Sequence, residues 1–141
     1  MIRKYQKSDL SSVYNIWLKA STIAHPFLEK AFVEKVKADM LNIYIPNSDT
    51  WVYEVKGAIL GFIGMHGNEI GGLFVDPQSQ SQGIGTQLVD YISQSYNELE
   101  VEVFKKNRIG RPFYEKYGFI LINESMHEES NQVVFRMKYR K

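Results

Sequence analysis

The sequence predicts one domain of mixed α/β class (α+β), in which a mostly antiparallel sheet is flanked by helices. Strand-like segments separated by tight turns cluster between residues 50 and 76. A strand, helix, strand succession over 69–104 needs a crossover connection, so its two strands should run parallel. The 141 residues fit a single domain over 1–141, and a chain of this size buries enough surface for a core without disulfides.

The first third of the chain predicts one short strand and two helices. Residues 1–6 alternate loosely, which favours a strand. Apolar residues then recur at helical spacing over 9–21 and again over about 28–41, and Pro26 separates the two helices. A turn cluster at 46–49 should end this helical region.

The remainder of the chain should alternate between strands and helices. Strands are predicted where β-branched, aromatic and aliphatic residues lie between turn residues. These segments are 50–55, 58–65, 69–76, 99–104, 119–122 and 133–139. Helices are expected at 83–96, which opens on glycine, and at 109–117.

Composition excludes several classes of function. Lys plus Arg number 17 and Asp plus Glu 16, so the net charge is +1 and there is no global field for nucleic acid or anionic lipid. The absence of cysteine excludes disulfides and thiolate zinc sites, and favours a cytoplasmic location. No apolar run is long enough to span a membrane, and the charged N-terminus does not resemble a signal peptide.

A glycine loop between residues 73 and 88 carries the strongest functional signal. An apolar strand ends, a polar loop follows, and the next helix begins on Gly83-Ile84-Gly85. The first N–H groups of a helix have no internal partners, and the helix dipole adds positive potential there. The missing β-carbons let an anion approach the backbone, so the loop is suited to hold a phosphate.

The loop alone leaves three interpretations open. A dinucleotide-binding fold would have a third glycine where Leu88 stands. A P-loop would have a lysine at the helix start, and there is none. A glycine-rich turn without any ligand is about as common as a functional one.

Two motifs together resemble the GNAT superfamily of N-acetyltransferases, most closely its small single-domain bacterial members. The first is Gln80-x-x-Gly83-x-Gly85, and the second is Asn107 followed by the block 112–119, Pro-Phe-Tyr-Glu-Lys-Tyr-Gly-Phe. The resemblance covers essentially the whole chain. It implies that acetyl-CoA donates an acetyl group to a primary amine by direct attack in a ternary complex. The alternative is a non-catalytic acyl-CoA-binding or regulatory domain of the same fold.

The resemblance also implies which residues bind acetyl-CoA. They belong to the strand before the loop, the loop itself and the segment before the second motif. They are Leu73, Phe74, Val75, Gln80, Ser81, Gln82, Gly83, Ile84, Gly85, Thr86 and Asn107. Many family members carry Arg or Lys where Gln82 stands, so here the backbone amides and the helix dipole must do more to neutralise the pyrophosphate.

Tyr114 and Glu69 are the catalytic candidates. The resemblance places Tyr114 near the sulfur of coenzyme A, where a phenol with pKa about 10 could protonate the leaving thiolate; otherwise it is a packing aromatic. Glu69 lies eleven positions before Gln80, where some lysine-acetylating family members place a catalytic base. The alternative for Glu69 is a solvated hairpin carboxylate.

His25, Phe27 and His66 are the candidates for binding the acceptor. His66 lies at a turn, and the resemblance places the segment around His25 and Phe27 beside the acceptor pocket. Either histidine could also act as the base. The three histidines of the chain lack metal-ligand spacing, so no metal site is expected.

Gly71 and Gly72 are unusual within a strand, and predict a β-bulge, a close approach of the donor's pantetheine arm, or both. The sequence leaves the acceptor open between a small amine, an aminoglycoside, a peptide N-terminus and a protein lysine. It is equally compatible with a monomer and a homodimer.

Overall fold

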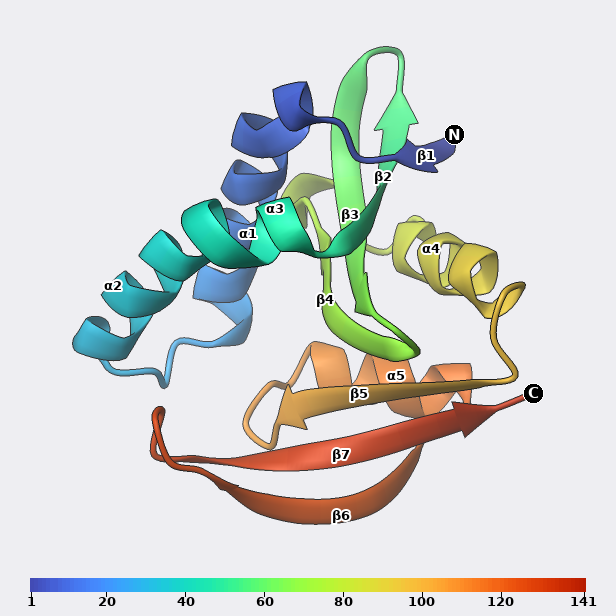
Figure 1. Cartoon of the computed structure of the whole chain (residues 1–141). Coiled ribbons are helices and arrows are strands. Elements are labelled where there is room, and N and C mark those ends of the chain that lie inside the picture. Colours follow the sequence, from blue (N-terminus) through green and yellow to red (C-terminus); the bar gives the residue numbers. More distant parts are fainter.

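The computed structural model describes residues 1–141 and contains a seven-stranded sheet in the order β1-β2-β3-β4-β5-β7-β6. Every neighbouring pair is antiparallel except β4 and β5 (Figure 1). The strands are β1 (Ile2–Lys4), β2 (Asp49–Val55), β3 (Ala58–His66), β4 (Glu69–Val75), β5 (Glu98–Phe104), β6 (Ile120–His127) and β7 (Gln132–Arg140). The predicted class is confirmed, because a mixed and mostly antiparallel sheet with flanking helices is what the chain forms.

The helices lie on both faces of the sheet (Figure 1). They are α1 (Leu10–Ala24), α2 (Lys30–Asp39), α3 (Ile45–Asn47), α4 (Ile84–Ser93) and α5 (Gly110–Tyr117). Alternation along β3 explains the layers: Phe62 belongs to a core of six buried residues beneath α1, and Ile63 to a core of 14 buried residues that includes α4. No helix is long and apolar enough to cross a membrane.

The sheet opens between its two parallel strands. β4 and β5 pair only at Glu69 with Glu100 and at Ile70 with Val101, and they diverge beyond that point. On the other side of β4, Gly72 pairs with Gly64 and Ile70 pairs with Met65, which leaves Gly71 as an extra residue. The bulge predicted at the glycine pair is therefore present, and it lies where the sheet splits.

Two predicted boundaries differ most from the structure, while α1 ends three residues later and α4 three residues earlier than predicted. The second helix does not end at about residue 41 as predicted, because α2 continues through a π-helical turn, Met40–Tyr44, into α3, which includes two residues of the predicted turn at 46–49. Pro46 lies directly after this π-helical turn, as the second residue of α3. β6 also runs five residues past the predicted end at 122, because the polar residues of this exposed edge strand hide its alternation.

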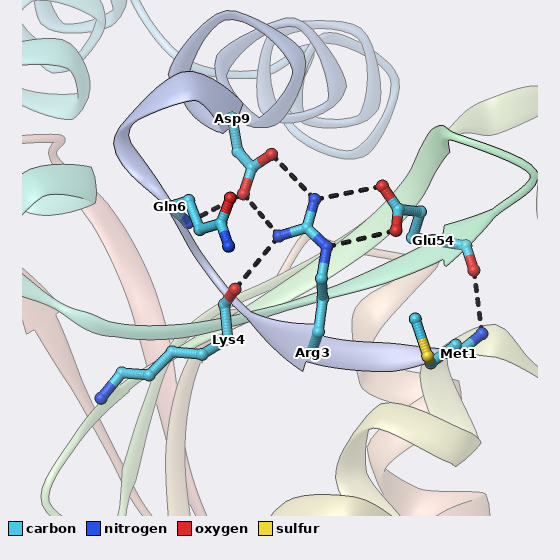
Figure 2. A network of polar contacts seen from close by, with 6 residues as sticks. All are labelled: Met1, Arg3, Lys4, Gln6, Asp9 and Glu54. Carbon is cyan, nitrogen blue, oxygen red and sulfur yellow. Dashed lines mark hydrogen bonds and ion pairs between the residues drawn. The ribbon is translucent and has the colours of Figure 1, made fainter.

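A network around Arg3 on β1 links this strand to Glu54 on β2 and to Asp9 just before α1 (Figure 2). The guanidinium donates to Asp9 at 2.8 and 3.0 Å and to Glu54 at 3.1 and 3.2 Å. Asp9 also accepts the backbone N–H of Gln6, and the hydrogen bonds from Arg3 lower the pKa of its carboxyl group. These contacts fix the start of α1, which forms one wall of the candidate site described next.

Candidate active site

Two cavities lie on either side of the point where the sheet splits, and Phe74 on β4 is the one residue that lines both. The glycine-loop cavity, of about 860 Å³, is lined by the second half of β4, the loop after it and α5. The α2 cavity, of about 710 Å³, is lined by α1, α2, β3 and the first half of β4. The bulged strand therefore presents successive segments to two different spaces.

The glycine-loop cavity contains most of the residues predicted to bind the donor. Ten of them line it: Leu73, Phe74, Val75, Gln80, Ser81, Gly83, Ile84, Gly85, Thr86 and Asn107. Gln82 does not line this cavity, so its side chain is not aimed at the predicted pyrophosphate position.

The start of α4 has the geometry of an anion site. Gly83 has φ +80°, a left-handed conformation that favours glycine, and the first hydrogen bond of the helix runs from Gln87 N–H to Gly83 C=O. The amides of Ile84, Gly85 and Thr86 therefore have no partner within the helix. A β-carbon on Gly85 would lie 3.2 Å from the Phe113 ring, so this glycine also lets α5 pack closely.

One cation reaches the glycine-loop cavity, and sequence reasoning missed it. Four basic residues follow β5, and none of them lines the cavity: Lys105, Lys106, Arg108 and Arg111. Arg111 instead stacks on Phe135, 4.8 Å from the ring centroid, and donates to the Lys105 carbonyl. Lys116 on α5 lines the cavity instead. It lies three residues after Phe113 and so shares a face of the helix with it, which is the periodicity that could have identified it.

Tyr114 is buried, with only 6% of its surface exposed, and it lines the glycine-loop cavity. Its ring packs edge-on against Phe113 and Phe119, and its hydroxyl makes no side-chain hydrogen bond to another protein group. Burial raises the pKa of the phenol, so the group stays protonated at neutral pH. A proton donor thus borders this cavity, as the acid role requires.

Asn107 holds the start of α5 and contacts a residue of the other cavity. Its Oδ1 accepts the backbone N–H groups of Ile109 at 3.1 Å and Gly110 at 2.8 Å. Its Nδ2 lies 3.2 Å from Nε2 of His25. A β-carbon on Gly110 would come within 2.7 Å of Nδ2, so glycine is needed at that position. One Nδ2 hydrogen is left for a ligand.

His25 lines the α2 cavity and packs edge-on against Phe104 and Phe27, with ring centroids 5.0 and 5.8 Å apart. Burial lowers the pKa of His25 to about 4, because the charged imidazolium would be poorly solvated there. Phe27 does not line the cavity, and its contacts are with His25 and Phe104. In this structure Phe27 therefore supports the histidine.

The α2 cavity combines an apolar wall with acidic groups. Phe32, Val33, Val36 and Met40 are among its apolar residues, and it is lined by two carboxylates and no lysine or arginine. Glu69 is one of the two, and its Oε2 accepts from Arg136 at 2.7 Å.

Arg136 on β7 forms ion pairs with three carboxylates. Besides Glu69, it contacts Glu100 at 3.0 Å and Glu102, the second carboxylate of the cavity, at 3.8 Å. One cation among three anions leaves an excess of negative charge at this edge of the cavity.

His66 is the third predicted acceptor-side residue, and it also lines the α2 cavity. Its Nε2 lies 3.2 Å from Ser48 Oγ. A β-carbon on Gly71 would lie 2.7 Å from the His66 ring, so this imidazole covers the bulge where the sheet splits. The structure holds no group of three or more His, Asp or Glu residues arranged for a metal ion.

Known proteins resemble the chain over its whole length. A family model described as an acetyltransferase (GNAT) domain matches residues 6–141. The peptidyl-lysine N-acetyltransferase YiaC of Escherichia coli is 31% identical over 140 residues, which cover 99% of this chain and 96% of that protein.

Solved structures share the fold. The solution structure of apo-form YjaB from Escherichia coli matches with a TM-score of 0.89 at 22% identity, covering 99% of this chain and 96% of that one. The PaiA N-acetyltransferase from Thermoplasma acidophilum, solved in complex with coenzyme A, matches with a TM-score of 0.73 at 18% identity and covers 99% and 98% of the two chains.

Proposed function

The chain belongs to the GNAT acetyltransferase family, and from this premise we propose that it transfers the acetyl group of acetyl-CoA to the ε-amino group of lysine side chains in peptides or proteins. The observation that carries the proposal is the pair of cavities that meet at Phe74. One has the features of a phosphate-bearing donor site and the other the features of a site for a cationic chain. Substrates in the two cavities would meet where the sheet splits.

The glycine-loop cavity is the proposed donor site. The free amides at the start of α4 and the left-handed Gly83 suit a pyrophosphate. Lys116 supplies the side-chain charge that Gln82 does not. The backbone of 73–75 has no partner strand on its β5 side, because pairing ends at Ile70, so an extended pantetheine arm can add there as a strand would.

The α2 cavity is the proposed acceptor site. Its apolar wall suits the four methylene groups of a lysine side chain. Its excess of negative charge suits the ammonium group before that group loses a proton. The relative YiaC carries the name peptidyl-lysine N-acetyltransferase, which supports lysine over the other amines that the sequence left open.

The chemistry requires two proton movements. A base lining the α2 cavity takes a proton from the ammonium group, and the neutral amine then attacks the thioester carbon. A C–N bond forms and the C–S bond breaks, with the electron pair leaving on sulfur. Tyr114 donates its hydroxyl proton to that sulfur. The new amide nitrogen loses a proton, and this proton restores the Tyr114 hydroxyl. The net reaction releases one proton, and Glu69, His25 and His66 are the groups predicted to accept it.

A screen of acceptors with acetyl-CoA tests the proposal by thiol release and by mass spectrometry of the acceptor. The central pair is an N-terminally blocked peptide with one lysine and the same peptide with norleucine in that position. An unblocked lysine-free peptide, a polyamine and an aminoglycoside complete the panel. We expect thiol release and peptide acetylation with the lysine peptide and neither with its norleucine control. Turnover of only a small amine would contradict the lysine assignment, and no turnover with any acceptor would contradict catalysis.

A further inference from the structure

Three histidines line the α2 cavity: His25, His66 and His127. Nδ1 of His127 accepts the backbone N–H of Ser130, so its electron pair is occupied. The hydrogen bonds of the other two, His25 and His66, give them opposite tautomers. An imidazole can act as a base only through a nitrogen whose electron pair is not already accepting a hydrogen bond. The contacts of His25 and His66 reveal which ring nitrogen holds that pair in each case. They therefore separate two residues that the sequence could only offer as alternatives.

His25 has its electron pair occupied. The two backbone N–H groups donated to Asn107 Oδ1 fix the orientation of that amide, so Nδ2 must face His25. An amide nitrogen only donates, and Nε2 of His25 must therefore accept. The proton of the neutral ring is then on Nδ1. With its pair engaged and its pKa lowered to about 4, His25 is unsuited to take a proton from an amine.

His66 has the reverse arrangement. Ser48 Oγ lies 2.6 Å from the Tyr44 carbonyl and 3.2 Å from His66 Nε2, and a serine has a single hydroxyl hydrogen. The shorter contact holds that hydrogen, since a carbonyl can only accept. Ser48 must then accept from His66, so the ring proton is on Nε2. A chain from Nε2 through Ser48 to the carbonyl of Tyr44 orients the ring and leaves the electron pair on Nδ1 free.

We propose that His66 is the catalytic base and that its Nδ1 takes the proton from the acceptor ammonium group. This inference rests on the proposed function and assigns one step of it. His66 covers Gly71, the bulged residue that lies three positions before Phe74, the residue shared by the two cavities. Its side chain is also exposed, so the imidazolium can pass the proton on to water after each turnover.

The charged and titratable groups around His66 support this division of roles. Glu69 is its partner across the hairpin, and beyond Glu69 lie Arg136 and Glu102. Tyr44 lies on the other side, next to Ser48. Because Glu69 is ion-paired to Arg136, it serves as an anion that attracts the substrate ammonium group, and His66 accepts the proton. The ion pair remains intact throughout the reaction.

The kinetic test compares His66→Gln with Glu69→Gln, using the blocked single-lysine peptide and saturating acetyl-CoA from about pH 6 to about pH 10. We expect His66→Gln to lower kcat roughly 100- to 10,000-fold near neutral pH, with a smaller loss at alkaline pH where the free amine is abundant. Glu69→Gln should mainly raise KM for the peptide and keep the wild-type shape of the pH profile. Ser48→Ala should show an intermediate loss, because the ring loses its orienting partner.

Two kinetic results would overturn the assignment. One is a His66→Gln protein that turns over within about twofold of wild type across the pH range. The other is a Glu69→Gln protein that loses the pH dependence that His66→Gln retains.

A second measurement does not depend on turnover. Long-range proton–nitrogen NMR spectra of the wild-type protein report the tautomer of each of its three histidines, and the His66→Gln spectrum assigns one of them. We expect an Nε2–H tautomer for His66 and an Nδ1–H tautomer for His25. An Nδ1–H tautomer at His66 would overturn the proposal even if the enzyme is active. If the protein acetylates nothing, the proposed function fails, and the tautomers still decide whether His66 is built as a base.

Discussion

The two cavities of this protein are built in different ways. The glycine-loop cavity draws most of its lining from one continuous stretch, the end of β4 through the start of α4, together with α5. The α2 cavity collects single residues from α1, α2, β3, β4, β5 and the end of β6. The first presents backbone amides and the left-handed Gly83, while the second is made of side chains brought together by the fold.

This difference separates phosphate binding, which depends on local backbone structure, from acceptor binding, which depends on contacts between distant segments. A strand–loop–helix unit can hold a phosphate by itself, since the amides and the dipole belong to the backbone. The proposed acceptor site instead combines the Arg136 ion pairs, the His66–Ser48 contact and the α2 wall, which come from distant parts of the chain. Variants on each side test this division.

The largest effect is expected from Gly83→Val. A valine at this left-handed position places a branched side chain at the free amides of α4, so acetyl-CoA binding should fall below detection in calorimetry. Gly57→Val is the matched control, because Gly57 has nearly the same φ, +82° against +80°, and open space around it far from either cavity. Both variants carry similar backbone strain, roughly 1–3 kcal/mol. Equal acetyl-CoA affinity in the two variants would remove the glycine loop from the donor site.

Tyr114→Phe should separate chemistry from packing on the donor side. Phenylalanine keeps the ring that packs against Phe113 and Phe119, so the change should leave the melting temperature and acetyl-CoA affinity nearly unchanged. Loss of the proton donor should lower kcat roughly 100- to 10,000-fold. A variant that turns over at the wild-type rate would make Tyr114 a packing residue only.

The fold and the cavity proposed for the donor could largely be predicted from the sequence, because their signals are local. Helical spacing predicted α1 and α4, and Gly83 with Gly85 indicated the loop that lines the glycine-loop cavity. The exposed strand β6 was underestimated because its pairing with β7 rather than its alternation holds it in place.

The acceptor site could be predicted only in part. His25, His66 and Glu69 were identified as individual residues and do line one cavity. Arg136, which pairs with Glu69, lies 67 residues away in sequence, and the Asn107–His25 contact spans 82. No periodicity joins residues at such separations, so neither the ion pair nor the tautomers could be anticipated.

His25 lines the α2 cavity and contacts Asn107, which lines the glycine-loop cavity. Protonation of His25 should break this contact. Its pKa is about 4 in the folded protein against about 6.5 when unfolded, so the unfolded state binds more protons between these values. The free energy of unfolding should therefore have its full value above about pH 6.5 and fall by about 3 kcal/mol as the pH drops to about 4. Urea unfolding at several pH values measures this, with His25→Gln as control, since glutamine can still accept from Asn107. If the free energy of unfolding falls equally steeply with pH in both proteins between about pH 6.5 and about pH 5, this prediction is contradicted.

The smallest effect is expected from Lys116→Met. Loss of one exposed cation at the donor cavity should raise KM for acetyl-CoA about two- to fivefold at low salt and less at high salt. Lys106→Met, which removes a lysine that does not line the cavity, should leave KM unchanged. Identical KM values for the two variants would show that backbone amides alone bind the pyrophosphate.

The most direct test of the account is the affinity of a bisubstrate analogue. In this compound the sulfur of coenzyme A is joined through an acetyl bridge to the ε-nitrogen of a blocked lysine peptide. Because the cavities meet at Phe74, the analogue should occupy both at once and bind at least about 100-fold more tightly than coenzyme A or the peptide alone. Binding no tighter than that of coenzyme A would show that the cavities do not hold donor and lysine together, and would contradict the proposed transfer.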